Sequence, residues 1–298
     1  MGNYYYIISG LPDISFDDSK AALTPSEFRT EVYDALSGAD RKVMDMLLLE
    51  NDCRNLLSEL SVSENSAVSA VSAREKESAV SVLSARAYKG LYSQEQLEEL
   101  ISAVKAQDRC PQGIPQFMYK FVQEWQDESW RELAGFAEDR LWALFYDYAM
   151  QADNEFVRNW YSFNLDVNNI QTAITARKYE LDMQKVIVGQ NDTAHALRTS
   201  GARDWGLSQE LDYFDDVVRL LDEDELSYRE RKADMLRWRW LEDNTFFNYF
   251  GVERLFSYLV RLGIVERWTS LDKEQGQQLF RQLIGDLKEQ TEVPAEFR

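Results

Sequence analysis

The stretch PQFMYKFVQEW (Pro115–Trp125) decides the fold class, because it opens the longest segment of the chain without proline. Its Phe117, Phe121 and Trp125 recur every four residues, which places the three rings on one face of an α-helix. The next proline is Pro294, so no residue between the two prolines forces a helix to end. The segment therefore predicts mostly helix.

Helix start signals occur on both sides of this stretch. Thr24-Pro25-Ser26-Glu27 is a capping box with proline at the first helical position, and Ser93-x-x-Gln96 is a second box. Asp153 is the predicted cap of a helix that carries several aromatic residues. Further helices are predicted near 208–222, 226–243, 245–262 and 272–289.

The sequence predicts an all-α fold, a multi-helix bundle with at most one short strand. Only Tyr4–Ser9 is rich enough in aromatic and β-branched residues for that strand. We divide the chain into an N-terminal helical region, 1–110, and a helical bundle region, 111–298, with repeats expected near 111–205 and 206–298.

The Ser/Ala-rich segment 61–89 differs in composition from the rest and has no aromatic residue before Tyr88. Such a composition buries little area per residue, which is typical of a mobile loop or linker. The alternative is a closely packed helical hairpin, because Val68, Val71 and Val80 are separated by small residues. We favour the helical alternative.

The charge balance restricts the partners of the chain. It has 33 Lys and Arg against 52 Asp and Glu, a formal net charge of −19. A nucleic-acid partner requires a basic face, and an anionic lipid surface requires a basic segment. We therefore expect no nucleic-acid binding and no direct lipid binding.

Cysteine usage and hydropathy indicate the compartment. Cys53 and Cys110 lie far apart and outside any C-x-x-C motif, which is not a disulfide framework. The N-terminus lacks the features of a signal peptide, and no run of about 18 apolar residues occurs. We expect a cytoplasmic protein.

Motifs that carry chemistry are scarce, so we expect no enzyme, no cofactor and no metal. His195 is the only histidine, which leaves too few ligands for a zinc site, and its polar context predicts a surface or capping residue. The phosphate-binding motifs G-x-x-x-x-G-K-[ST] and G-x-G-x-x-G and the hydrolase motif G-x-S-x-G do not occur. The segment Arg237-Trp-Arg-Trp240 resembles a single-strand binding surface, but neighbouring acids favour core aromatics with paired arginines on the rim.

Two segments of the chain share a pattern in which Asp precedes Asn by three residues: Asp52 with Asn55, and Asp166 with Asn169. Asp52 and Asn55 lie inside a predicted helix, where Asp and Asn side chains are unfavourable, so we expect both to hydrogen-bond to a neighbouring element. The tyrosine-rich N-terminus is the suggested partner. Asp166 is interpreted as the N-cap of a helix with Val167, Ile170 and Ile174 on its buried side.

The segment Asp166-x-x-Asn169-Ile170-x-Thr172-x-Ile174, with Arg177-Lys178 after it, resembles the repeated helix signature of the C-type (also called d-type) central-stalk subunits of V-type ATPases. Asn3–Pro12 and Asp52–Leu57 are similar to an uncharacterised bacterial family encoded beside V-type ATPase subunits. In the family pattern a basic residue directly follows the aliphatic pair. This sequence departs from it, because Thr175 occupies that position and Arg177 comes two residues later. A third repeat is fainter, at 243–258.

The resemblance implies a funnel of three pseudo-symmetric helical bundles that seats the rotating shaft on the membrane ring without catalysis. The implied partners are the stalk and ring subunits, and the implied location is peripheral to the inner membrane through the complex. The implied structural and interaction residues are Asp52, Asn55, Asp166, Asn169 and Arg177.

Two alternatives stay open. A free-standing cytosolic scaffold would bind a protein partner through exposed aromatics such as Trp205 or Trp268. An enzyme would use carboxylates such as Glu124 or Asp147 in a helical pocket, although spacing singles out no pair of acids.

Overall fold

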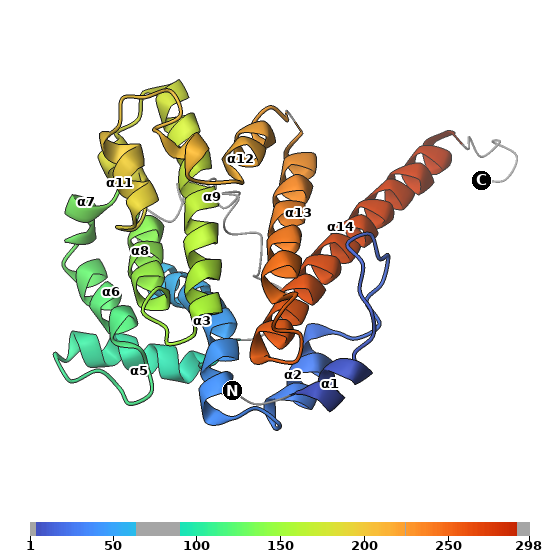
Figure 1. Cartoon of the computed structure of the whole chain (residues 1–298), viewed down its shortest axis with the longest axis horizontal. Helices are drawn as coiled ribbons and strands as arrows, with labels where there is room; N and C mark the ends of the chain where they lie inside the picture. Colours follow the sequence, from blue (N-terminus) through green and yellow to red (C-terminus); the bar gives the residue numbers. More distant parts are fainter. Residues whose placement is uncertain (1–3, 64–89, 224, 291–298) are drawn as a thin grey trace, which may run out of the picture.

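The computed structural model describes residues 4–63, 90–223 and 225–290, with side chains as far as residue 271. Within these ranges the chain is all-α and contains no strand (Figure 1). The helices are α1 Tyr5–Gly10, α2 Pro25–Tyr33, α3 Gly38–Ser63, α5 Gln94–Lys105, α6 Gln116–Gln126, α7 Trp130–Leu133, α8 Ala137–Ala149, α9 Glu155–Tyr179, α10 Met183–Val186, α11 Asp192–Thr199, the 3-10 helix η1 Leu207–Gln209, α12 Phe214–Leu220, α13 Leu226–Thr245 and α14 Val252–Gln290.

The capping boxes are confirmed. Thr24 accepts from the backbone N–H of Glu27, whose carboxylate accepts from the N–H of Thr24, and Pro25 is the first residue of α2. Ser93 and Gln96 bond in the same reciprocal way at the start of α5. Both helices begin where their side chains satisfy backbone donors that have no partner within the helix.

The one short strand that the sequence allowed, at Tyr4–Ser9, does not form, because residues 5–10 form α1. A strand needs a neighbouring strand to bond its backbone N–H and C=O groups, and the described residues contain no strand that could pair with this segment. The Tyr4 N–H instead donates to the carbonyl of Phe250 at 3.0 Å, and the Tyr4 hydroxyl donates to Asp40 Oδ2 at 2.5 Å. Tertiary contacts therefore override the β-propensity of the tyrosines.

The helices predicted at 245–262 and 272–289 are one helix, α14, of 39 residues. Residues 246–251 form the turn before it, and the chain continues through Gly263 between the buried Leu262 and Ile264. Packing on both sides of this glycine outweighs its low helix propensity. The helix predicted at 208–222 is also shorter in the structure, where η1 and α12 occupy this region.

Helix α9 lies at the centre of the fold and contacts α8, α10, α11 and α12 (Figure 1). Its N-cap is Asn154, one residue after the predicted Asp153, and the Asn154 amide also donates to Glu253 Oε1 of α14 at 2.9 Å. An aromatic seam joins α9 to α13 and α14, with Trp160 in ring contact with both Trp240 and Phe256. These rings belong to the core that α9 organises.

The predicted helical hairpin in 61–89 lies outside the described residues, apart from residues 61–63 at the end of α3. No helix in the described ranges combines the length and the apolar composition needed to cross a membrane. The division of the chain near Cys110 stays a prediction.

Replacing Phe256 by Ala tests the aromatic seam. Phe256 is fully buried against Phe156 and Trp160, so the variant should lower the free energy of unfolding by about 3–5 kcal/mol. The matched control is Phe247→Ala, which removes an exposed ring and should stay within about 0.5 kcal/mol of wild type. Urea unfolding measures both, and equal effects would contradict the assignment of the core.

Candidate functional site

Asp52 on α3 holds the segment that leads into α5. Its side chain is fully buried and accepts from the backbone N–H groups of Leu91 at 2.8 Å and Tyr92 at 3.1 Å. A Cβ atom at Gly90 would lie 2.0 Å from Asp52 Oδ1, so glycine permits the close approach. The prediction that Asp52 bonds to a neighbouring element is confirmed. The suggestion that the N-terminus is its partner is wrong, because Asp52 instead accepts from two backbone N–H groups of the 90–92 segment.

Burial raises the pKa of the Asp52 carboxyl from its ordinary value to about 6. The two N–H bonds oppose this shift by stabilising the charged form, but desolvation outweighs them. The ionisation of this carboxyl is therefore linked to folding near neutral pH.

Asn169 on α9 holds the segment that precedes α11. Its amide donates to the carbonyl of Val188 at 2.8 Å and accepts from the N–H of the same residue at 2.9 Å. The adjacent Gly189 has a φ of +78°, and a Cβ atom there would lie 2.7 Å from Leu165 Cδ2. Glycine therefore permits both the backbone conformation and the close approach to α9.

Asp166 lies one turn before Asn169 and joins two loops. Its carboxylate accepts from the Asn191 amide at 2.7 Å and from the Tyr213 hydroxyl at 2.9 Å. Asn191 is in turn the N-cap of α11. The interpretation of Asp166 as an N-cap is wrong, because α9 begins at Glu155 and Asp166 is buried in its interior. Burial raises the pKa of Asp166, and its hydrogen bonds oppose the rise.

The two Asp-x-x-Asn segments thus perform a similar task with different residues. In α3 the Asp binds the loop backbone, whereas in α9 the Asn does so and the Asp binds the cap residue. Asn55 is exposed, unlike its counterpart Asn169, and its side chain forms no hydrogen bond within the described residues, so the expectation that it also bonds to a neighbouring element is wrong. We call these two arrangements the loop staples.

Arg177 near the end of α9 closes a third loop. Its guanidinium donates to the carbonyls of Arg203 at 2.6 Å and Ala202 at 3.0 Å, and lies 3.8 Å from the ring centroid of Trp205. Trp205 is buried beneath it, so the expectation that this ring is exposed is wrong. The same expectation is wrong for Trp268, which is buried and donates to Asp234 Oδ2 at 2.8 Å.

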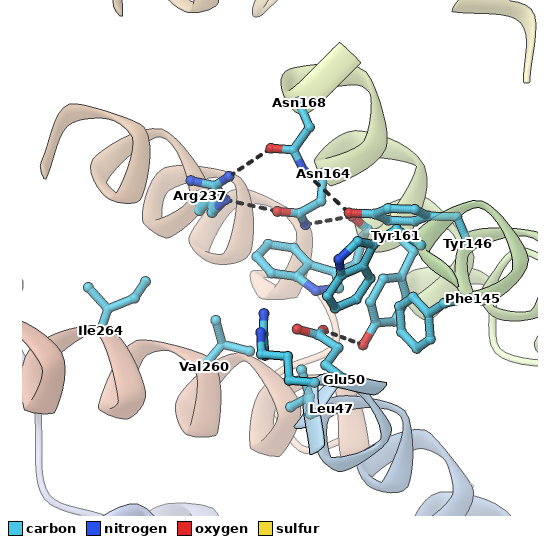
Figure 2. A pocket seen from close by; sticks show the side chains of 13 residues that line it. Leu47, Glu50, Phe145, Tyr146, Tyr161, Asn164, Asn168, Arg237, Val260 and Ile264 are labelled. Carbon is cyan, nitrogen blue, oxygen red and sulfur yellow. Dashed lines mark hydrogen bonds between the residues drawn. The ribbon is translucent and has the colours of Figure 1, made fainter. Parts of the chain in front are cut away.

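A cavity with a mostly apolar and aromatic lining and a few polar side chains lies between α3, α8, α9, α13 and α14 (Figure 2). Its volume is about 60 Å³, enough for several water molecules. The lining residues are Leu47, Glu50, Arg54, Trp142, Phe145, Tyr146, Trp160, Tyr161, Asn164, Asn168, Arg237, Val260 and Ile264.

Arg237 is the buried cation of this cavity. Its Nε donates to Asn164 Oδ1 at 2.9 Å and its Nη2 to Asn168 Oδ1 at 3.4 Å, as Figure 2 shows. Its Nη1 lies 3.8 Å from Asp234 Oδ1. The prediction of a rim position for Arg237 is wrong, because amides on α9 provide acceptors inside the core. Desolvation lowers the pKa of this guanidinium.

The cavity does not assemble a pair of acids. Among its described lining residues Glu50 carries the one carboxylate, and it accepts from the Tyr161 hydroxyl at 2.8 Å. Glu124 forms a two-point ion pair with Arg140, at 2.7 and 2.8 Å, and Asp147 does not line the cavity. The carboxylate pair of the enzyme alternative is therefore not found at this cavity.

In the described part of the chain, no group of three or more His, Cys, Asp or Glu side chains is placed to hold a metal ion. His195 is exposed near the start of α11, as predicted. Cys53 and Cys110 are free thiols.

Sequence reasoning missed Asn164 and Asn168, which bind Arg237 in the core. The sequence does contain a signal for them, which is the number of asparagines in one helix. Asparagine is unfavourable inside a helix, yet α9 contains Asn159, Asn164, Asn168 and Asn169. Several asparagines in one helix indicate side chains with specific partners.

A family model described as "Protein of unknown function (DUF2764)" matches residues 1–291. No curated protein and no solved structure matches the chain. The family match includes both loop staples and all residues that line the cavity.

The loop staple of α9 is tested by Asn169→Ala. The variant removes both bonds to Val188 and should lower the free energy of unfolding by about 2–3 kcal/mol. Asn55→Ala is the matched control, since the side chain at the corresponding position of α3 is exposed and its loss should cost less than about 0.5 kcal/mol. Chemical denaturation gives both values, and an equal cost at the two positions would refute the staple.

Asp52 gives a pH dependence with a definite sign. A folded-state pKa near 6 lies above the ordinary value of 3.8, so the native chain retains a proton that the unfolded chain has lost. The contribution of Asp52 to the free energy of unfolding therefore falls as pH rises through 6, by about 1 kcal/mol between pH 5 and pH 7. Asp52→Asn should remove this part of the slope. Urea unfolding of both proteins across this range measures the difference, and parallel pH profiles would contradict the assignment.

Proposed function

We propose that the chain, which belongs to the DUF2764 family of proteins of unknown function, is a non-catalytic helical subunit or accessory protein of a V-type (A-type) ATPase. In this role it lies at the central stalk and couples the rotor shaft to the membrane ring through contacts between helices. The observation that carries the proposal is the resemblance of Asp166–Lys178, within α9, to the repeated helix signature of the C-type stalk subunits.

The use of buried polar side chains supports a structural role. Asp52, Asp166 and Asn169 each bind loop groups of their own chain, and Arg237 binds the amides of a neighbouring helix. Such bonds fix the relative positions of helices and loops. A stalk protein that transmits torque needs this kind of internal rigidity.

The two loop staples support a repeated architecture. Each consists of a long helix, α3 or α9, whose interior polar residue holds the loop before a shorter helix, α5 or α11. In the proposed funnel of helical bundles these are two of the repeated units. The region after residue 243 contributes the third.

The net charge of −19 directs the proposed docking toward a basic protein surface. Like charges repel at an anionic membrane, so contact with the rotor ring runs through protein groups. Electrostatic attraction to a basic partner speeds association at low salt and is screened as salt rises.

The alternative function is a free-standing scaffold for a cytosolic protein partner. Exposed aromatic rings on α1 and before α14 favour a protein-binding role of either kind. Trp205 and Trp268 do not contribute to it, because both are buried. The identity of the partner separates the two functions.

Co-purification tests the proposal. An affinity-tagged chain expressed in its native cells should recover the A and B subunits of the V-type ATPase, in fixed proportion and with ATPase activity. The on-rate of the purified chain to that complex should fall as ionic strength rises, because the chain is acidic. Consistent absence of the chain from an intact, active complex would refute the proposal. Recovery of an unrelated soluble protein in fixed proportion would favour the scaffold.

A further inference from the structure

Six aromatic side chains gather on the surface where α1 meets the turn between α13 and α14. We call them the aromatic cluster: Tyr5, Tyr6, Phe246, Phe247, Tyr249 and Phe250. Tyr6 is 90% exposed, Phe246 72% and Phe247 92%. Single exposed rings are common on proteins, but a group of this size on one surface typically marks a contact site.

Ring contacts join four members of the cluster, Tyr5, Tyr6, Tyr249 and Phe250, and the other two form a pair on the same turn. The Tyr4 N–H donates to the Phe250 carbonyl, and the rings of Tyr5 and Phe250 lie 4.8 Å apart. The rings of Phe246 and Phe247 lie 5.1 Å apart on the same turn. In Figure 1, α1 and the start of α14 lie near the same end of the molecule. The α13–α14 turn therefore carries both the rings that contact α1 and the exposed Phe246–Phe247 pair.

The fold does not depend on the exposed rings of this turn. Thr245 before it and Val252 after it are fully buried, and the Thr245 hydroxyl donates to the Leu241 carbonyl at 2.7 Å. These two residues anchor the ends of the turn, while Phe246 and Phe247 face outward. Two consecutive phenylalanines so exposed contribute little to folding, which points to a role in binding.

Charge identifies the occupant of the cluster. A second copy of the chain also carries −19, so self-association would bring two strongly acidic proteins together. Anionic lipid is disfavoured for the same reason. The exposed Asp243 lies three and four residues before Phe246 and Phe247, so the acid is on their part of the turn, whereas Arg254 lies 4.9 Å from the ring centroid of Tyr249 at the other end of the cluster. A protein surface that is apolar at its centre and basic at its edge complements this arrangement.

We propose that the aromatic cluster is a docking surface for an apolar helix face flanked by Lys or Arg on a stalk subunit of the ATPase. This inference rests on the proposed function and names the part of the chain that makes the contact. Phe246 and Phe247 insert between side chains of the partner helix, and Asp243 pairs with a flanking cation. Aromatic anchors of this kind dominate the binding energy of protein interfaces.

The test uses the full chain and the V-type ATPase purified from the same cells after deletion of the gene for the chain. The double variant Phe246→Ser/Phe247→Ser should bind at least about tenfold more weakly than wild type, because it removes two anchor rings. The matched control is Tyr179→Ser/Tyr228→Ser, which removes two exposed rings at other sites and should bind as wild type does. Urea unfolding should give similar stabilities for all three proteins.

The outcomes separate the docking surface from the proposed function. Failure of the wild-type chain to bind the complex refutes the function and, with it, this choice of partner. Equal binding by wild type and the Phe246/Phe247 variant overturns the docking surface alone. Sedimentation that shows self-association of wild type but not of the variant assigns the cluster to a second copy. Binding of wild type, but not the variant, to phosphatidylglycerol vesicles assigns it to lipid. Either result also overturns the proposal.

Discussion

The hydrogen-bonding requirement of the polar side chains buried on α9 is the constraint on which the rest of the structure depends. Asp166 and Asn169 are buried, and the half-buried Asn164 and Asn168 lie within the same two turns of the helix. Each would destabilise the core if its polar atoms had no partner. Their partners come from the loop before α11, from Tyr213 before α12 and from Arg237 on α13. The hydrogen bonds that these polar side chains of α9 require therefore fix the positions of three neighbouring segments.

A similar constraint operates at α3 and between α13 and α14. Asp52 is buried and depends on two backbone donors, which positions the start of α5. Asp234 is also fully buried and is paired with Arg237 on its own helix and with Arg267 on α14. Burying a charge is costly, and removing one member of such a group leaves an uncompensated charge behind. These polar groups make the arrangement of helices specific, while aliphatic and aromatic side chains from nearly all the longer helices supply the apolar burial.

Local signals in the sequence were sufficient for the fold class and for several helix starts. Thr24 and Ser93 cap their helices through residues three positions away, so the sequence itself contains both partners. Prediction was wrong where the deciding partner lies far along the chain. The helical state of residues 5–10, the burial of Trp205 beneath Arg177 and the interior position of Arg237 all follow from such contacts. In the candidate site, Asp52, Asp166, Asn169 and Arg177 bond to loops and Asn55 is exposed, so their role in interaction stays a prediction. Neither the bonding partners nor the cavity followed from spacing alone.

Helix α14 has a mechanical consequence. With 39 residues and a rise of 1.5 Å per residue it is about 58 Å long, and Figure 1 shows it extending away from the other helices. Its first turns are clamped by the buried Leu255, Phe256 and Leu259. Burial continues as far as Trp268, so the arm that leaves the core is about 33 Å long, and a tilt of about 10° at its base moves the far end by about 6 Å. Small rearrangements of the core thereby become large displacements near Gln290.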